Sequence, residues 1–276
     1  MRTVISFFIY TNIFVSISAL SLYKITELIF DFRNNIIGCF VFFATLFAYN
    51  YMRLPFFFAE ENRPRNFWIE KNIHIIYLIL VISFFSICYC VSVLGVIFLY
   101  LTVPIILISC MYPIRIDYVN KLYALREIPL LKIFLIATSW SSMTVLIPLL
   151  YLGYTIDYYL ISHLLRIFLF IIAISIPFDI RDLHLDKVNT IPKYIGVLNA
   201  KIFSFFCLFI FELLLIFDLL NSLLPVPIFL SLFISIELSA LIIYSSNEKR
   251  SEWFYSILVE SLSIIMCLFV LVMSMI

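Results

Sequence analysis

Charged residues and glycine are both scarce in this chain of 276 residues. Only 13% of the residues are charged and 64% are hydrophobic, whereas a soluble domain has about 25% charged and roughly 45 to 50% apolar residues. That balance excludes an ordinary globular core. The four glycines are too few for glycine-mediated helix packing, so bulkier side chains and Ser or Thr must fill the helix contacts. The composition therefore predicts a polytopic membrane protein.

Recognisable zinc and disulfide patterns are lacking as well. The six cysteines fall in or beside apolar runs, without a CxxC pair or a histidine partner, which favours small buried side chains. The net charge of +1 argues against a nucleic-acid partner. No low-complexity tract or soluble segment interrupts the chain. Residues 1–276 are therefore predicted to form a single membrane domain.

Nine apolar runs of about 20 residues, the length that a helix needs to cross a bilayer, are present in the sequence. They cover residues 4–23, 35–52, 73–91, 93–111, 129–151, 158–178, 201–220, 223–244 and 254–275. Because lipid offers no water to stray backbone groups and the runs lack strand alternation, each is predicted to be an α-helix. The expected fold is an all-α bundle of nine transmembrane helices in contact with the lipid bilayer.

Lysine and arginine predict the orientation of this bundle. Of the 18 basic residues, all but Lys24, Arg33 and Arg166 lie before the first run or after an even-numbered one. The positive-inside rule then places the N-terminus in the cytoplasm and the C-terminus outside, in a bacterial cytoplasmic membrane. The first run could instead be a signal peptide, since Arg2 precedes it and Ser16–Ser18 resembles a cleavage site, but its removal would break this alternation of charge.

Three carboxylates follow the sixth run, in the stretch SIPFDIRDLHLDK. On a helix Asp179, Asp182 and Asp186 would lie at about 0°, 300° and 340°, on one face. Such a row repels itself, so a cation is expected there, and hard oxygen ligands suit Mg²⁺ shared with a substrate phosphate. Basic residues gather nearby and suit the binding of a diphosphate. These residues are Arg115, Lys121, Arg126, Lys187 and Lys193. The alternative is a charged helix cap in which Arg181 and Lys187 balance the acids.

Two segments resemble the UbiA superfamily of intramembrane prenyltransferases. SIPFDIRDLHLDKVNTIPKYIG is similar to the second acidic motif of that family, and MYPIRIDYVNKLYALREIPLLKIFLIATSW to its loop after the fourth helix. The resemblance implies Mg²⁺, an isoprenyl diphosphate and a lipophilic acceptor such as an aromatic quinone precursor. It assigns Asp179, Asp182 and Asp186 as catalytic and metal-binding residues. It also places Tyr112 and Arg115 near the tyrosine and basic positions of the loop, although the usual spacing puts the base at Ile116.

The loop after the second run departs from the family pattern NDxxDxxxD. Asn50 is kept and is predicted to contact the diphosphate, but the aspartate positions hold Tyr51, Leu54 and Phe58. Three interpretations are open. Arg53 could replace a metal ion as the cation that faces the diphosphate, for which its guanidinium fork is suited. Glu60 and Glu61 could act as substitute ligands. Prenyl transfer could also have been lost.

Two other functions are compatible with these residues. The first is a catalytically degenerate homologue that binds an isoprenoid lipid or quinone without turnover, which the missing first motif favours. The second is a transporter, although the paired helix breaks expected of one are lacking. Histidine at position 163 is interpreted as interfacial, while Arg166 is expected to pair with an intramembrane acid. The acids considered are Glu212, Asp218, Glu237 and Glu260.

Overall fold

The computed structural model describes residues 2–54, 64–118, 121–124, 128, 130–183 and 190–275, which form helices and one short hairpin. The elements are α1 (Arg2–Tyr10), α2 (Ile13–Ile29), α3 (Asn35–Tyr51), α4 (Pro64–Lys71), α5 (Ile73–Leu94), α6 (Val96–Met111), β1 (Arg115–Tyr118), β2 (Lys121–Ala124), α7 (Leu131–Ser141), η3 (Ser142–Leu146), α8 (Ile147–Tyr151), α9 (Tyr158–Arg181), α10 (Ile191–Ile195), α11 (Val197–Leu220), α12 (Val226–Ser245), η4 (Phe254–Val259) and α13 (Glu260–Met273).

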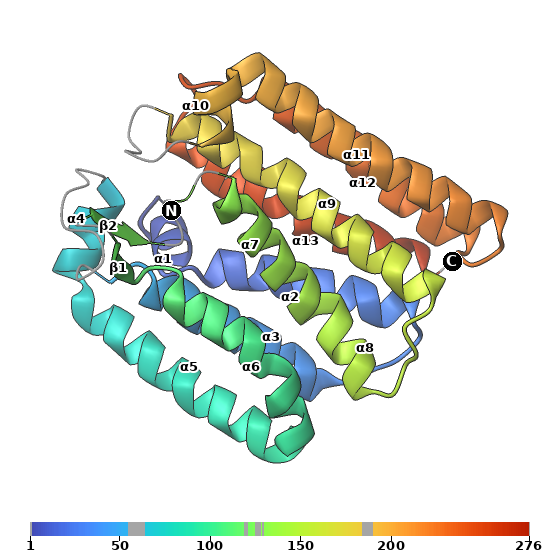
Figure 1. The fold of residues 1–276 in the computed structure, drawn as a ribbon, viewed down its shortest axis with the longest axis horizontal. Helices are drawn as coiled ribbons and strands as arrows, with labels where there is room; N and C mark the ends of the chain where they lie inside the picture. Colours follow the sequence, from blue (N-terminus) through green and yellow to red (C-terminus); the bar gives the residue numbers. More distant parts are fainter. Residues whose placement is uncertain are drawn as a thin grey trace.

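The long helices lie side by side as a bundle (Figure 1). Within it, α9 packs against α7 and α11, and α2 packs against α3 and α13. The short elements α4, β1, β2 and α10 lie toward the same end as the N-terminus, whereas the C-terminus lies at the opposite end. We call the end with α4, the hairpin and α10 the acidic end, because Asp179 and Asp182 lie there at the close of α9.

Six helical segments among the described residues are long and apolar enough to cross a membrane. They are Ile73–Leu94, Leu131–Tyr151, Tyr158–Arg181, Val197–Leu220, Val226–Ser245 and Phe254–Met273. Large apolar side chains face outward along them, such as Phe85 on α5 and Leu198 on α11. The chain is therefore a multi-pass integral membrane protein. The helices Asn35–Tyr51 and Val96–Met111 are apolar but shorter, so the six long segments account for only part of the nine predicted crossings.

The first predicted helix differs most from the structure. Residues 4–23 were expected to form one span, but the chain breaks between α1 and α2 at Thr11 and Asn12. Asn12 adopts the left-handed conformation with φ of 61°, and its side chain bonds to Asn50 and Arg53. These polar ties interrupt an apolar run that would otherwise continue as a helix. Beyond Tyr23, α2 continues to Ile29 and includes an ion pair between Lys24 and Glu27, which lowers the cost of placing both charges on the helix.

The remaining predicted runs match helices to within a few residues at each end. The chain turns between the third and fourth runs at Gly95, which has φ of 84° and ψ of 178°. The fifth and ninth runs each contain a π-helical segment, η3 and η4. Pro148 lies two residues after the end of η3. Since proline lacks the N–H of an ordinary helical turn, a change in hydrogen-bond spacing just before it accommodates the residue.

Serine contributes to the contacts between helices, as the shortage of glycine predicts. Ser231, Ser235 and Ser239 are buried one turn apart on α12. Ser231 donates to the carbonyl of Phe269 on α13 at 3.2 Å. Ser18 of α2 donates to the carbonyl of Glu260 on α13 at 2.7 Å. Hydroxyl groups of this size let neighbouring backbones approach and satisfy their own hydrogen bonds where no water is present.

Candidate active site

Asp179 and Lys132 form an ion pair across two helices at the acidic end. Lys132 Nζ on α7 donates to Asp179 Oδ1 on α9 at 2.8 Å. Asp179 is buried while it still belongs to the last turn of α9. A buried carboxylate needs a counter-charge to stay ionised, and Lys132 provides one. The pair thus fixes α7 and α9 together at the position of the first predicted catalytic acid.

Asp182 is held by its sequence neighbour. Arg181 donates to it through Nε and Nη2, both at 2.8 Å, in a bidentate contact. The Arg181 guanidinium lies 5.4 Å from the ring of Phe178 and 5.8 Å from the ring of Tyr255 on η4. Cation–π contacts with two rings and a bidentate carboxylate bond orient the arginine firmly. Asp182 therefore lies in a defined position where α9 ends.

The predicted helical row of three acids is only partly formed. The α-helix ends at Arg181, and Asp182 is its C-cap with φ of −89° and ψ of 7°, so the helical spacing does not extend beyond it. Asp186 and Lys187 lie outside the described residues. Lys193, on α10, is exposed at the same end. Among the acids of the motif, the structure thus brings Asp179 and Asp182 together through their shared helix end.

A second polar cluster lies where α3 ends. Asn50 is buried, and its amide donates to the carbonyls of Thr11 and Leu46, both at 2.8 Å, while its oxygen accepts from Asn12 at 3.1 Å. Arg53 Nη1 donates to Asn12 Oδ1. These bonds use both amide hydrogens of Asn50, so the residue joins α3 to the break between α1 and α2. Its predicted contact with a diphosphate stays a prediction.

Arg53 is oriented toward the interior of the acidic end. Its guanidinium lies 5.8 Å from the ring of Tyr49, and the Tyr49 hydroxyl accepts from Trp140 Nε1 on α7 at 3.1 Å. Arg53 is thereby linked through Tyr49 to α7.

The loop after α6 places the other predicted residues. Tyr112 is the C-cap of α6. Arg115 and Lys121 lie on β1 and β2 of an antiparallel hairpin, in which Arg115 pairs with Ala124 and Tyr118 with Lys121. Phe58, Glu60, Glu61 and Arg126 lie outside the described residues. Two of the predicted basic residues, Arg115 and Lys121, therefore belong to the hairpin at the acidic end.

The described acids fit one divalent ion completed by a substrate. Mg²⁺ usually takes one or two carboxylates together with waters and phosphate oxygens, and Asp179 and Asp182 supply two carboxylates at the end of one helix. At the end of α3, positions 51 and 54 hold tyrosine and leucine. Within the described ranges, no group of three or more His, Cys, Asp or Glu is arranged to hold a metal ion. A second ion would therefore lack protein ligands among these residues.

Several residues of this site gave no clear signal in the sequence. In the sequence, Lys132 is only one of several basic residues that follow the fourth apolar run. Its pairing with α9 is a tertiary contact, which no spacing along the chain predicts. Tyr255 looked like any aromatic residue in an apolar run. Asn12 did carry a signal, because an asparagine within an apolar run is costly in lipid unless it is bonded.

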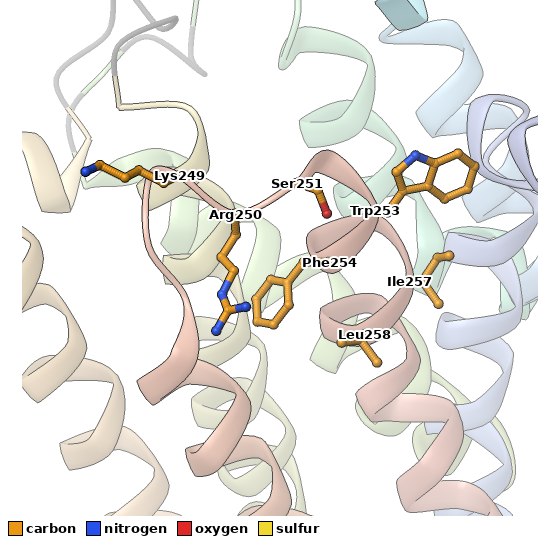
Figure 2. A pocket seen from close by; sticks show the side chains of 7 residues that line it. All are labelled: Lys249, Arg250, Ser251, Trp253, Phe254, Ile257 and Leu258. Atoms are coloured by element: carbon orange, nitrogen blue, oxygen red, sulfur yellow. The ribbon is translucent and has the colours of Figure 1, made fainter.

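A surface groove lies beside the acidic end, at the turn between α12 and η4. Its volume is about 490 Å³. It is lined by Lys249, Arg250, Ser251, Trp253, Phe254, Ile257 and Leu258. Figure 2 shows the Arg250 side chain folded toward Phe254, whose ring lies 5.3 Å from the guanidinium. Neither Asp179 nor Asp182 lines this groove, so it is distinct from the carboxylate pair.

Comparisons with solved structures identify the fold. A UbiA homologue from Aeropyrum pernix K1 superposes with a TM-score of 0.71 at 13% identity, over 93% of this chain and 97% of that one. A UbiA homologue from Archaeoglobus fulgidus, bound to GPP and Mg²⁺, gives 0.63 at 10% identity, over 98% and 100%. The chain has the UbiA fold. A digeranylgeranylglyceryl phosphate synthase gives 0.59 at 16% identity, over 100% and 98%.

The UbiA resemblance inferred from the two sequence segments is thus confirmed for the fold. No protein-family model matches the sequence, and no curated protein matches it. Identities of 10 to 16% explain this result, since the bundle can be kept by the pattern of apolar runs while most individual side chains change.

Proposed function

We propose that the chain is a membrane prenyltransferase of the UbiA type. It transfers an isoprenyl group from an allylic diphosphate to a lipophilic acceptor of the aromatic or quinone-precursor class. One observation carries this proposal: two buried carboxylates, Asp179 and Asp182, lie at the end of α9 in a chain with the fold of a homologue that is bound to GPP and Mg²⁺. All nine apolar runs would cross the membrane, with the acidic end and the N-terminus in the cytoplasm.

The bond changes of this reaction define what the residues must do. The C–O bond between the allylic carbon and the diphosphate breaks, and its electron pair stays on the pyrophosphate oxygen. The prenyl carbon then bonds to a nucleophilic carbon of the acceptor, which releases a proton to solvent. The protein must therefore stabilise negative charge on the leaving group and keep water from the allylic carbon.

The residues at the acidic end suit these tasks. Asp179 and Asp182 would hold one Mg²⁺, with Asp186 as a further candidate ligand, and when bound the ion would neutralise charge on the pyrophosphate. Lys132 and Arg181 keep the two carboxylates in place. The basic residues Arg53, Arg115, Lys121, Lys187 and Lys193, with Tyr112, would surround the diphosphate. The buried apolar side chains of α9, such as Phe170 and Ile176, would help to exclude water.

The proposal is tested by assaying transfer with purified protein in detergent. The protein is incubated with Mg²⁺, quinone precursors and labelled geranyl, farnesyl or longer diphosphates. Asp179→Asn and Asp182→Asn should each lower the rate by about a hundredfold or more, because charge stabilisation of several kcal/mol is lost. Asp31→Asn is the matched control, since Asp31 is an exposed acid at the opposite end. Absence of transfer across the whole panel, beside an active homologue, would contradict the proposal.

A lipid-binding protein without turnover is the second candidate. It is favoured by the end of α3, where Tyr51 and Leu54 stand in place of acids. Isoprenoid lipid or quinone should then co-purify with the protein, and Mg²⁺ should not produce transfer. Tyr51→Asp combined with Leu54→Asp separates the two functions, because activity that appears only in this variant would identify the parent as degenerate.

A further inference from the structure

The two ion pairs at the acidic end expose their cations more than their carboxylates. The Lys132 side chain is 26% exposed, against 3% for Asp179. In the second pair, Arg181 is 17% exposed, against 10% for Asp182. The cations of these pairs are therefore more accessible to an approaching anion than the carboxylates are.

Of the two cations, Lys132 is better placed to contact a ligand. Arg181 donates from Nε and Nη2 to Asp182 and lies against two rings. Its guanidinium is therefore engaged within the protein. The ammonium group of Lys132 can donate in three directions. Its bond to Asp179 is therefore compatible with a second bond to a phosphate oxygen.

We propose that Lys132 binds the diphosphate of the substrate directly, so that part of the diphosphate affinity is independent of Mg²⁺. The inference rests on the proposed function, since it specifies how that same site holds its substrate. Asp179 keeps the ammonium charged and in position, and a lysine acts on phosphate as a compact point charge. The described acids supply ligands for one ion, and Lys132 adds positive charge that a second ion would otherwise bring.

Arg53 is a second cation that is held in a fixed position, just past the end of α3. Its guanidinium is fixed by Asn12 and the ring of Tyr49. Tyr49 in turn bonds to Trp140 on α7, the helix that carries Lys132. Arg53, just past the end of α3, is thereby linked through Tyr49 to the helix that carries Lys132, and a diphosphate carries enough charge to bond to more than one cation.

The test measures binding rather than turnover. Purified protein is titrated with inorganic pyrophosphate and with geranyl diphosphate by calorimetry, in Mg²⁺ and in EDTA. The wild-type protein should retain measurable affinity in EDTA. Lys132→Gln should weaken that EDTA-resistant affinity by about tenfold or more, the loss of one charge-assisted hydrogen bond. Lys132→Arg should retain it, and Lys71→Gln, an exposed lysine on α4, should leave it unchanged.

Two further variants guard against misfolding and separate the roles of the pair. Lys132→Gln leaves Asp179 buried without this cation, so Lys132→Gln/Asp179→Asn removes both charges together and should also lose the EDTA-resistant affinity. Asp179→Asn alone should bind pyrophosphate in EDTA as well as or better than the wild type. The carboxylate no longer competes for the ammonium or repels the anion, although the Mg²⁺-dependent part of the affinity falls.

The outcomes distinguish this inference from the function on which it rests. Binding that requires Mg²⁺ in the wild type and is unaffected by Lys132→Gln would overturn the role of Lys132 and leave the prenyltransferase proposal standing. Absence of diphosphate binding in both buffers would overturn the two together. Binding that survives EDTA in the wild type and in Lys71→Gln, but is weakened by about tenfold or more in Lys132→Gln and in Lys132→Gln/Asp179→Asn, supports the proposal.

Discussion

Arg166 and Asp218 form an ion pair that the bundle encloses completely. Arg166 Nη2 on α9 lies 3.1 Å from Asp218 Oδ2 on α11, and neither side chain has any exposed surface. Ser162 donates to the same carboxylate oxygen at 2.8 Å. Arg166 Nε, Nη1 and Nη2 and Asp218 Oδ1 have no hydrogen-bond partner within the described part of the chain, so the contact between Nη2 and Oδ2 is an ion pair without hydrogen-bond geometry. The pair joins α9 to α11, but it satisfies its own polar atoms only in part.

Removing one member of this pair should be far more harmful than removing both. Arg166→Met leaves a buried carboxylate without its counter-charge, which should lower the free energy of unfolding by about 3 to 5 kcal/mol. Arg166→Met/Asp218→Leu replaces the pair by apolar side chains and should recover most of that loss. Thermal unfolding of detergent-purified protein, followed by size-exclusion fluorescence, measures both. A double variant as unstable as the single one would show that the pair itself stabilises the fold.

The fold could be predicted from the sequence because lipid imposes one strong rule. Each long apolar run had to be a helix, and the runs at 158–178 and 201–220 lie within α9 and α11. The rule failed at the first run, where Asn12 bonds to residues of α3. That contact joins positions far apart in the chain, so the asparagine within the apolar run indicated that a partner was needed but not which residue would be the partner.

The candidate site was less predictable for the same physical reason. The acids at 179 and 182 could be found because carboxylates beside a membrane span are costly and therefore rare. Their partners could not all be found. Arg181 adjoins Asp182, whereas Lys132 reaches Asp179 from a helix 47 residues away in sequence. Likewise, His163 was interpreted as interfacial, but it is buried and bonds to Thr26 on α2 at 3.0 Å.

Asn12 should affect substrate binding through Arg53. Asn12→Gly keeps the left-handed backbone but removes the oxygen that accepts from Arg53. We expect weaker binding of pyrophosphate, together with a loss of about 1 to 3 kcal/mol of stability because Asn50 loses a donor. Asn12→Ala should cost about 1 to 2 kcal/mol more, through backbone strain, without a further change in affinity. Calorimetry and thermal unfolding of the two variants separate these effects, and equal affinity in Asn12→Gly and wild type would exclude the role of Asn12.

Gly95 should tolerate no side chain at all. With φ of 84° and ψ of 178°, it occupies a region that is essentially restricted to glycine. A Cβ at this position would meet no atom within 4 Å, so any loss reflects the backbone alone. Gly95→Ala and Gly95→Asn should both lower stability by about 1 to 3 kcal/mol. Asp31→Asn, at φ of 48°, should be neutral because asparagine accepts the left-handed region. A stable Gly95→Asn protein would contradict this explanation of the turn.

Tyr255 should restrain the turn between α12 and η4. Its hydroxyl donates to the carbonyl of Asn247 at 2.5 Å and accepts from the Asn247 N–H at 3.2 Å. Tyr255→Phe keeps the ring beside Arg181 but loses both bonds. Stability should therefore fall by about 1 kcal/mol or somewhat more.

The sharper measurement is limited proteolysis of that turn. Trypsin cleaves after Lys249 and Arg250, which lie within it, and cleavage tracks the population of the open turn. Tyr255→Phe should therefore be cut faster than the wild type, whereas Tyr244→Phe, on the exposed face of α12, should not. Tyr255→Leu also removes the ring under Arg181, so it should lower prenyl transfer as well. If the phenylalanine variant were cut at the wild-type rate, the hydroxyl would not be what holds the turn against the end of α9.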